Sequence, residues 1–219
     1  MAGEYAAFFD LDDTILDTAS GKVFLEYCFN EGMYSVGEIA EGVMVGLGYR
    51  FGIYSAEEVV RMWAMYYKGW PREKMADLSN TLFETEIKKH IRPAAVEEIN
   101  RHKRNGAKIV MLSASTTFIC EPVQKLLEID DLLCTHLQVD EQDQLTGHLD
   151  GDYIYGRNKL VHGSKYCEKN NYKMAEAHYY GDSNADRFML DAVGYAYAVN
   201  PGTRLKALAQ TKGWSVVNW

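Results

Sequence analysis

The sequence lacks paired cysteines, an excess of basic residues and any long apolar run, and each absence excludes a class of protein. Its four cysteines are scattered singly, without a CxxC pair, which argues against a disulfide framework. A formal net charge of −8 argues against a nucleic-acid or membrane-surface binder. No run approaches the ~18 apolar residues of a membrane span, and the first residues lack the features of a signal peptide. We therefore predict a cytoplasmic protein without nucleic-acid or membrane partners.

The remaining composition is that of a globular protein. Apolar residues make up 47% and charged residues 25% of the 219, which is close to the globular average and excludes disorder and fibrous repeats. A chain of this length suffices for one core domain, or for a core with a smaller appendage. The sequence is compatible with a monomer and with a homodimer.

Strands and helices alternate over most of the chain. Residues 5–11 are apolar on both faces, as in a covered parallel sheet. Residues 21–90 show helical spacing and predict three or four inserted helices. Later strands are predicted at 107–112, 132–139, 145–155, 178–180, 195–199 and 215–217. The strands at 132–139 and 145–155 are expected to form a hairpin. Helices are predicted at 93–105, 118–129, 158–170 and 203–212. This alternation indicates an α/β fold with a parallel sheet and a helical insert after the first strand.

Acidic and hydroxyl side chains follow three of these strands. Asp10 and Asp12 end the first, Ser113 ends the second, and Asp182 follows the strand at 178–180. Because sites form at the carboxyl ends of parallel strands, we expect these residues to converge. Carboxylates at such short distances repel one another unless a cation neutralises part of their charge. Three acids around one point favour Mg²⁺, which takes a few carboxylates and keeps its other positions for water and substrate.

Four motifs in order give the chain its resemblance to the haloacid-dehalogenase superfamily of phosphatases. They are FFDLDDT at 8–14, IVMLS at 109–113, GRNK at 156–159 and GDSNAD at 181–186. The helical insert resembles the cap of the phosphoserine-phosphatase-like subfamily IB. The resemblance implies a Rossmann-like core domain at residues 1–18 and 91–219, and a small all-helical cap at residues 19–90 that moves as a lid about hinges at 18–22 and 90–93.

The resemblance also implies roles for the two aspartates of the first motif. Asp10 would be the nucleophile that forms an aspartyl-phosphate, which splits hydrolysis into two easier displacements. Asp12 would protonate the leaving alcohol and then deprotonate the attacking water. Asp10, the backbone carbonyl of Asp12 and Asp182 would hold Mg²⁺.

The other motifs would hold and neutralise the phosphate. Hydrogen bonds to its oxygens would come from Thr14, Ser113 and the backbone amide of Ala114. Lys159 would neutralise charge on nucleophile and phosphate, although Arg157 and Lys165 are neighbouring basic alternatives. Asp186, supported by Ser183, would position Lys159 or a metal-bound water. Such positioning and charge stabilisation supply most of the acceleration in phosphoryl transfer.

The expected activity is Mg²⁺-dependent hydrolysis of a small phosphomonoester metabolite. A phosphotransferase or phosphomutase would use the same intermediate but exclude water. A phospho-accepting receiver would gather similar residues, but receivers are compact single domains without a long insert.

The substrate itself stays open among phosphoserine, histidinol phosphate, phosphoethanolamine-type esters and sugar phosphates. The glutamate that usually holds the amino group of phosphoserine is absent at Ala19 and Ser20, although Glu26 could replace it. GDSNAD also departs from the GDGxND pattern of those enzymes. The insert combines aromatic and Met residues with basic ones, which favours a leaving group with an apolar part or a negative charge. The residues concerned are Met62, Trp63, Met65, Tyr66 and Tyr67, with Arg50, Arg61 and Lys68. We also expect one helical face to carry the rings of Trp63, Tyr66, Tyr67 and Trp70.

Overall fold

The part of the chain that the structure describes folds around one seven-stranded sheet. The structure, a computed structural model, describes residues 4–219, with the side chain of Arg50 outside the described part. The strand order is β4-β3-β2-β1-β5-β6-β7, and every pair is parallel except β3–β4. The strands are β1 (Ala6–Phe9), β2 (Lys108–Thr116), β3 (Asp131–Val139), β4 (Leu145–Asp150), β5 (His178–Gly181), β6 (Tyr195–Val199) and β7 (Ser215–Val217). This arrangement confirms the predicted α/β class.

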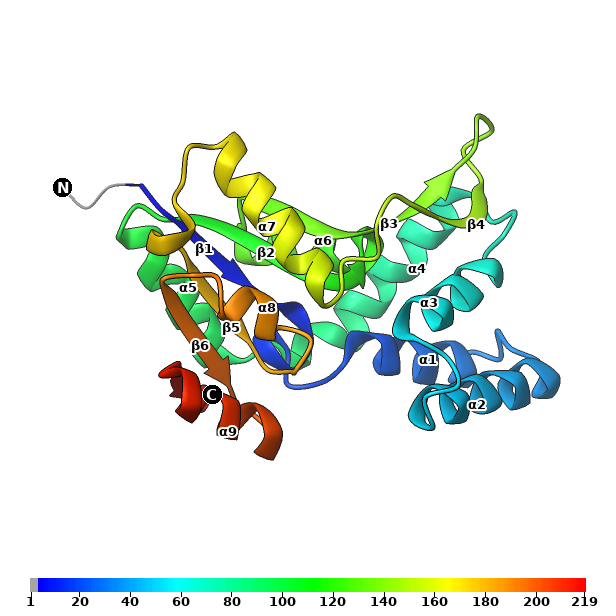
Figure 1. Cartoon of the computed structure of the whole chain (residues 1–219). Helices are drawn as coiled ribbons and strands as arrows, with labels where there is room; N and C mark the ends of the chain where they lie inside the picture. Colours follow the sequence, from blue (N-terminus) through cyan, green and yellow to red (C-terminus); the bar gives the residue numbers. More distant parts are fainter. Residues whose placement is uncertain (1–3) are drawn as a thin grey trace.

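Helices cover both faces of the sheet, and four more form the insert (Figure 1). The insert holds α1 (Ser20–Asn30), α2 (Val36–Arg50), α3 (Ala56–Met65) and α4 (Arg72–Thr85). The core holds α5 (Pro93–Arg104), α6 (Thr117–Leu127), α7 (Arg157–Lys169), α8 (Arg187–Leu190) and α9 (Thr203–Lys212). Short turns follow Phe9 (η1, Leu11–Ile15), α4 (η2, Ile87–His90) and α7 (η3, Met174–Glu176). No helix in the described part of the chain is long and apolar enough to cross a membrane.

Strand β1 is buried on both sides, as its sequence AAFF requires. Ala7 and Phe9 belong to one core cluster, which includes residues of α5 and α6. Ala6 and Phe8 belong to a second cluster, with residues of α7, α8 and α9. Because successive side chains of a strand point to opposite faces, β1 joins the two cores. The end of this central strand is therefore held rigidly, and it carries the first motif.

The insert and the core meet at the ends of the insert, at the β3–β4 hairpin and where α4 packs on α6. The segments that enter and leave the insert lie side by side, through a bridge between Leu16 and Ile91 and a 2.9 Å hydrogen bond from the Asp17 amide to the His90 carbonyl. The β3–β4 hairpin also reaches beyond the sheet toward α3 and α4 (Figure 1). There Leu145 exchanges backbone hydrogen bonds of 2.7 and 2.8 Å with Gly69 and Trp70. A lid motion of the whole insert would have to break this second connection.

The structure differs from the sequence-based expectation in three elements. Strand β2 does not end at Ser113 but continues to Thr116, because β3 accompanies it and Thr116 pairs with Thr135. The aromatic residues of 63–70 do not share one helical face, since α3 ends at Met65. Strand β4 stops at Asp150, so residues 151–155 do not continue it.

Two histidines, the buried His102 and the half-buried His178, lie beside the stacked tyrosines of β5 and β6. The ring of His102 bonds the hydroxyl groups of Tyr5 and Tyr180 at 2.8 and 2.9 Å. His178 stacks on Tyr195 with ring centroids 4.3 Å apart. Burial lowers the pKa of each histidine to about 4. The unfolded chain, with a histidine pKa near ~6.5, then binds protons more readily, so stability that is present above that pH is lost as pH falls toward 4.

We therefore expect the melting temperature to fall between pH 7.5 and 5. His178→Phe keeps the stacking and removes one titrating group, together with a buried ring nitrogen that has no partner in residues 4–219. The variant should reduce this pH-dependent fall in melting temperature, which calorimetry measures. His136→Phe, at an exposed position, should leave the fall in melting temperature unchanged. An equally steep fall in His178→Phe would contradict the assignment.

Candidate active site

The turn after β1 presents Asp10 at the edge of the sheet. The Asp10 amide continues the β1–β5 ladder through a 2.9 Å bond to the Tyr180 carbonyl. Residues 11–15 then form one wide turn, in which Asp13 takes a positive φ of 53°. The Leu11 amide donates to Asp10 Oδ1 at 2.8 Å. One carboxylate oxygen is thus held by the backbone, and the other points toward α7.

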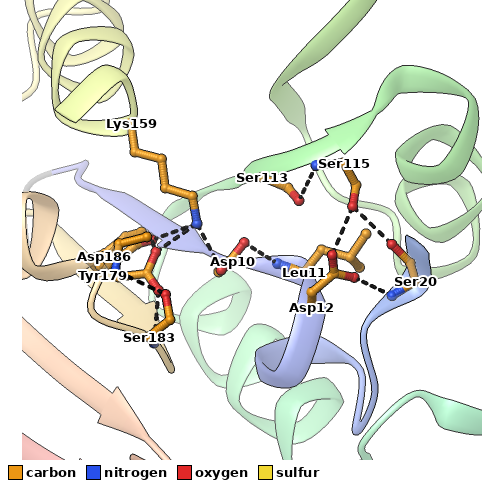
Figure 2. Close-up of polar contacts among 11 residues, drawn as sticks. Asp10, Leu11, Asp12, Ser20, Ser113, Ser115, Lys159, Tyr179, Ser183 and Asp186 are labelled. Carbon is orange, nitrogen blue, oxygen red and sulfur yellow. Dashed lines mark hydrogen bonds and ion pairs between the residues drawn. The ribbon is translucent and has the colours of Figure 1, made fainter. Parts of the chain in front are cut away.

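Lys159 bridges two buried carboxylates (Figure 2). Its ammonium lies 2.8 Å from Asp10 Oδ2 and 2.6 Å from Asp186 Oδ1, and its side chain is only 3% exposed. The Tyr179 hydroxyl also donates to Asp186. The neighbouring basic residues Arg157 and Lys165 are exposed. Of the three basic candidates, the fold therefore brings Lys159 to Asp10.

The loop after β5 folds tightly over Gly181. The Ser183 amide and hydroxyl donate to Asp186 Oδ2 at 3.0 and 2.7 Å. A Cβ atom on Gly181 would lie 2.7 Å from the Asp186 carboxyl carbon, so only glycine permits this approach. Both oxygens of Asp186 are occupied by Lys159, Tyr179 and Ser183, which suits a residue that positions Lys159.

The three acids near Lys159 carry more negative charge than the lysine balances. Carboxylate oxygens of Asp10, Asp182 and Asp186 lie within 4.8 Å of one another. Burial raises the pKa of Asp10 well above its usual range, despite Lys159. Burial and the charge of Asp186 raise the pKa of Asp182 to about 7. Burial would also raise the pKa of Asp186, but the Lys159 charge outweighs it and the pKa is lowered. An all-oxygen cluster with uncompensated charge fits a hard divalent cation.

Asp12 points away from this cluster, toward the insert (Figure 2). Its Oδ1 accepts the Ser20 amide at the start of α1, at 2.8 Å. Its Oδ2 accepts the Ser115 hydroxyl at 3.0 Å, and the hydroxyl groups of Ser20 and Ser115 are 2.9 Å apart. The side chains of Asp10 and Asp12 are therefore held by different partners, on opposite sides of the turn. The Asp12 side chain is not part of the acidic cluster.

The expected phosphate-binding residues lie at different depths. Ser113 Oγ accepts the Ser115 amide at 3.1 Å, which leaves its own hydrogen to donate. The Ala114 carbonyl accepts the Thr135 hydroxyl at 2.8 Å. Thr14 is fully buried, and its hydroxyl has no partner in the described structure. Ser113 is equally buried, and the role of Thr14 toward phosphate stays a prediction.

Sequence reasoning assigned no role at the site to three residues: Ser20, Ser115 and Tyr179. Ser115 had a signal, because it lies two residues after Ser113 in a strand and so shares its face. Tyr179 had none, since a tyrosine inside an apolar strand predicts core. Ser20 bonds Asp12 through its backbone amide, which any residue type except proline could supply, and it contacts Ser115 through its hydroxyl.

Ser115 allows a direct test of how Asp12 is positioned. Removing a hydrogen bond to a charged group costs ~1.5–3 kcal/mol, so we expect Ser115→Ala to lower kcat roughly 10–100-fold. KM should change little, because the bond orients Asp12 rather than the substrate. Ser115→Thr, which keeps the hydroxyl, should restore most of the rate. An unchanged kcat in Ser115→Ala would show that Asp12 does not depend on this bond.

Known proteins resemble the chain over nearly its whole length. The family model of haloacid dehalogenase-like hydrolases matches residues 7–191. A histidinol-phosphatase of Neisseria meningitidis is 24% identical, over 97% of this chain and 98% of its own length. A protein of unknown function from Bordetella pertussis has the same fold, with a TM-score of 0.90, 22% identity and 99% of each chain covered. A substrate-bound phosphoserine phosphatase has a TM-score of 0.70 and 18% identity, over 99% of this chain and 94% of its own.

These comparisons confirm the resemblance that the four motifs indicated. The family match includes all four motifs and the whole insert. The α/β architecture, with a helical insert after the first strand, is shared with the solved structures. The chain belongs to the haloacid dehalogenase-like hydrolase family and is a phosphatase of that family.

Proposed function

We propose that the protein is a Mg²⁺-dependent phosphomonoester hydrolase that acts on a small phosphorylated metabolite through an aspartyl-phosphate. The observation that carries the proposal is the separation of the two aspartates. Asp10 lies with Lys159 in the acidic cluster, and Asp12 lies on the other side with Ser115. This division suits a nucleophile and a separate proton donor.

The side chains would act in two half-reactions. Asp10 attacks the phosphorus atom while Lys159 balances the charge on the carboxylate and the phosphoryl oxygens. Asp12 gives its proton to the leaving oxygen, and the alcohol departs. Asp12 then takes a proton from a water molecule, which attacks the phosphorus atom of the aspartyl-phosphate and releases Asp10. Ser113 and the Ala114 amide would hold the phosphoryl oxygens in place.

Asp10, the Asp12 carbonyl and Asp182 would hold the metal ion. When bound, Mg²⁺ supplies positive charge to the phosphoryl oxygens and to the nucleophile. The raised pKa of Asp10 supports this need, because a buried carboxyl without further positive charge is held toward its protonated, non-nucleophilic form. Asp186, whose oxygens are already bonded, would serve through Lys159.

The insert, residues 19–90, would act as the cap that encloses the substrate, with the core at residues 1–18 and 91–219. An enclosed site suits a small metabolite better than a folded phosphoprotein. The four cysteines are free and buried, which supports a reducing, cytoplasmic location. The proposal includes neither nucleic acid nor membrane as a partner.

The assay is the release of inorganic phosphate from p-nitrophenyl phosphate by the purified protein. A phosphatase turns over repeatedly with water as acceptor, a phosphotransferase needs an added alcohol, and a receiver stops after one phosphate per chain. Mass spectrometry of beryllofluoride- or phosphate-trapped protein should place the adduct on Asp10. An adduct on any other residue would contradict the proposed chemistry.

We expect chelation with EDTA to abolish phosphate release and added Mg²⁺ to restore it. Asp182→Asn removes one charge from the cluster and should raise the Mg²⁺ concentration required for half-maximal rate, by about tenfold or more. A Mg²⁺ titration of the rate measures this, with Asp191→Asn, at an exposed site, as the control. Full activity in chelated enzyme would refute the metal requirement.

A further inference from the structure

A cavity of ≈ 510 Å³ lies next to Asp12. Asp12, Ser20 and Ser115 form part of its wall at the catalytic end. The rest of its wall comes mainly from the insert, including Phe24, Val59, Trp63 and Met75. A volume of this size accommodates a small ligand. Because Asp12 is the proposed donor to the leaving oxygen, the group that leaves with that oxygen would occupy this cavity.

The walls of the cavity are apolar and rich in aromatic rings. Among the described residues that line it, Asp12 is the single charged side chain. A carboxylate or a second phosphate placed there would lose its hydration without gaining an ionic partner, and a polyol would lose its hydration against walls that are mostly carbon. Six of the lining residues are aromatic, and rings prefer tilted or offset contacts with other rings. They are Phe24, Tyr49, Trp63, Tyr67, Tyr153 and Tyr155.

One buried hydroxyl in the wall has no partner. Ser79, in α4, lines the cavity and is 1% exposed. Its Oγ makes no hydrogen bond in residues 4–219. A buried polar group without a partner is costly, and native proteins usually supply one. A ligand in the cavity that carries a single hydrogen-bonding group could supply it.

Space for that ligand comes from two glycines of α2. Gly42 and Gly46 both line the cavity and lie one helical turn apart. A Cβ atom on either would meet nothing within 4 Å. Packing therefore does not require glycine at these positions, and glycine within a helix costs stability relative to alanine. The two glycines keep the cavity wide beside the aromatic side chains.

We propose that the leaving group of the substrate carries an aromatic ring, a short chain away from the ester oxygen, with one hydrogen-bonding group that reaches Ser79. This inference rests on the proposed phosphatase function and narrows its substrate class. Esters of sugars, of glycerol and of carboxylate-bearing alcohols such as serine are correspondingly poor substrates.

The test compares kcat/KM for 2-phenylethyl phosphate, 2-cyclohexylethyl phosphate, glycerol 1-phosphate and L-phosphoserine. We expect kcat/KM for 2-phenylethyl phosphate to be at least tenfold higher than for either polar ester. It should exceed kcat/KM for the cyclohexyl ester by a smaller factor. Equal rates, or a preference for a polar ester, would overturn the inference while leaving the phosphatase function intact. Absence of phosphate release from every ester, p-nitrophenyl phosphate included, would refute the function itself.

Two variants locate the effect in the cavity. Gly46→Leu fills the space beside the rings and should lower the preference for 2-phenylethyl phosphate over glycerol 1-phosphate at least tenfold. Ala40→Leu adds similar bulk on an exposed part of the same helix and should leave that ratio unchanged. Addition of a para-hydroxyl to 2-phenylethyl phosphate should raise kcat/KM in the wild type and not in Ser79→Ala. An unaltered ratio in Gly46→Leu would place the leaving group elsewhere.

Discussion

Asp10→Asn is expected to reduce phosphate release by about four orders of magnitude or more, without loss of stability. Loss of a covalent nucleophile leaves only the rate supplied by binding and charge stabilisation. The asparagine has nearly the same shape, and its oxygen can still accept the Leu11 amide that bonds Asp10 Oδ1 at 2.8 Å. Because Asp10 is buried with a raised pKa, removal of its charge should leave the melting temperature equal or higher.

Rates for Asp10→Asn and Asp12→Asn, with thermal melts of both, test this expectation. Loss of a general acid and base typically costs ~10²–10⁴-fold, so Asp12→Asn should retain more activity and still bind phosphate. A phosphoenzyme detected in Asp10→Asn would rule out Asp10 as the nucleophile.

Lys159→Met is expected to lower both activity and stability. The ammonium lies 2.8 and 2.6 Å from Asp10 and Asp186, and it is buried with them. Removing one member of a buried ionic group leaves uncompensated charge, which typically costs ~3–5 kcal/mol. At neutral pH we expect a loss of this size in the free energy of unfolding. The rate should fall as well, since the lysine charge then no longer balances the phosphate near Asp10.

Urea denaturation measures this loss, with Lys165→Met as the control on an exposed turn of the same helix. The free energy of unfolding of this surface variant should stay within ~0.5 kcal/mol of the wild-type value. For a buried carboxyl whose pKa is raised, protonation favours the folded state, so the gap between Lys159→Met and wild type should narrow as pH is lowered. A gap that does not depend on pH would mean that lost packing, not unpaired charge, causes the destabilisation.

Much of the site could be predicted because its residues follow strands. Asp10, Ser113 and Asp182 each stand where an apolar run ends, and parallel strands bring those ends together. Lys159 comes from a helix and was predicted only through the family resemblance. Helix starts were also predictable where the signal is local: Ser55 caps α3 with a reciprocal bond to Glu58, as serine followed three residues later by glutamate indicates.

The rest depends on contacts between distant segments. Tyr66, Tyr67 and Trp70 continue a helical spacing, but the Gly69 amide and the Trp70 carbonyl bond Leu145 of the β3–β4 hairpin. Gly69, with a positive φ of 80°, is a local stop signal, but its contact with the hairpin joins segments that are distant in sequence. The cavity is unpredictable for the same reason, since Ser79 and Trp63 line one space only after four helices have packed.

The adjacent ends of the insert also bear on how the chain folds. Phe8 of β1 pairs with Val110 and Tyr179, so the first strand must wait for partners far along the chain. Contacts of such long range are reached slowly, because the entropy of closing the loop is lost before the strands pair. Contacts among the helices of the insert span shorter stretches of the chain, although α4 also packs on α6 of the core. If they fold first, the bridge between Leu16 and Ile91 shortens the effective loop between β1 and β2. We therefore expect mutations that weaken the packing of α1–α4 to slow refolding of the sheet.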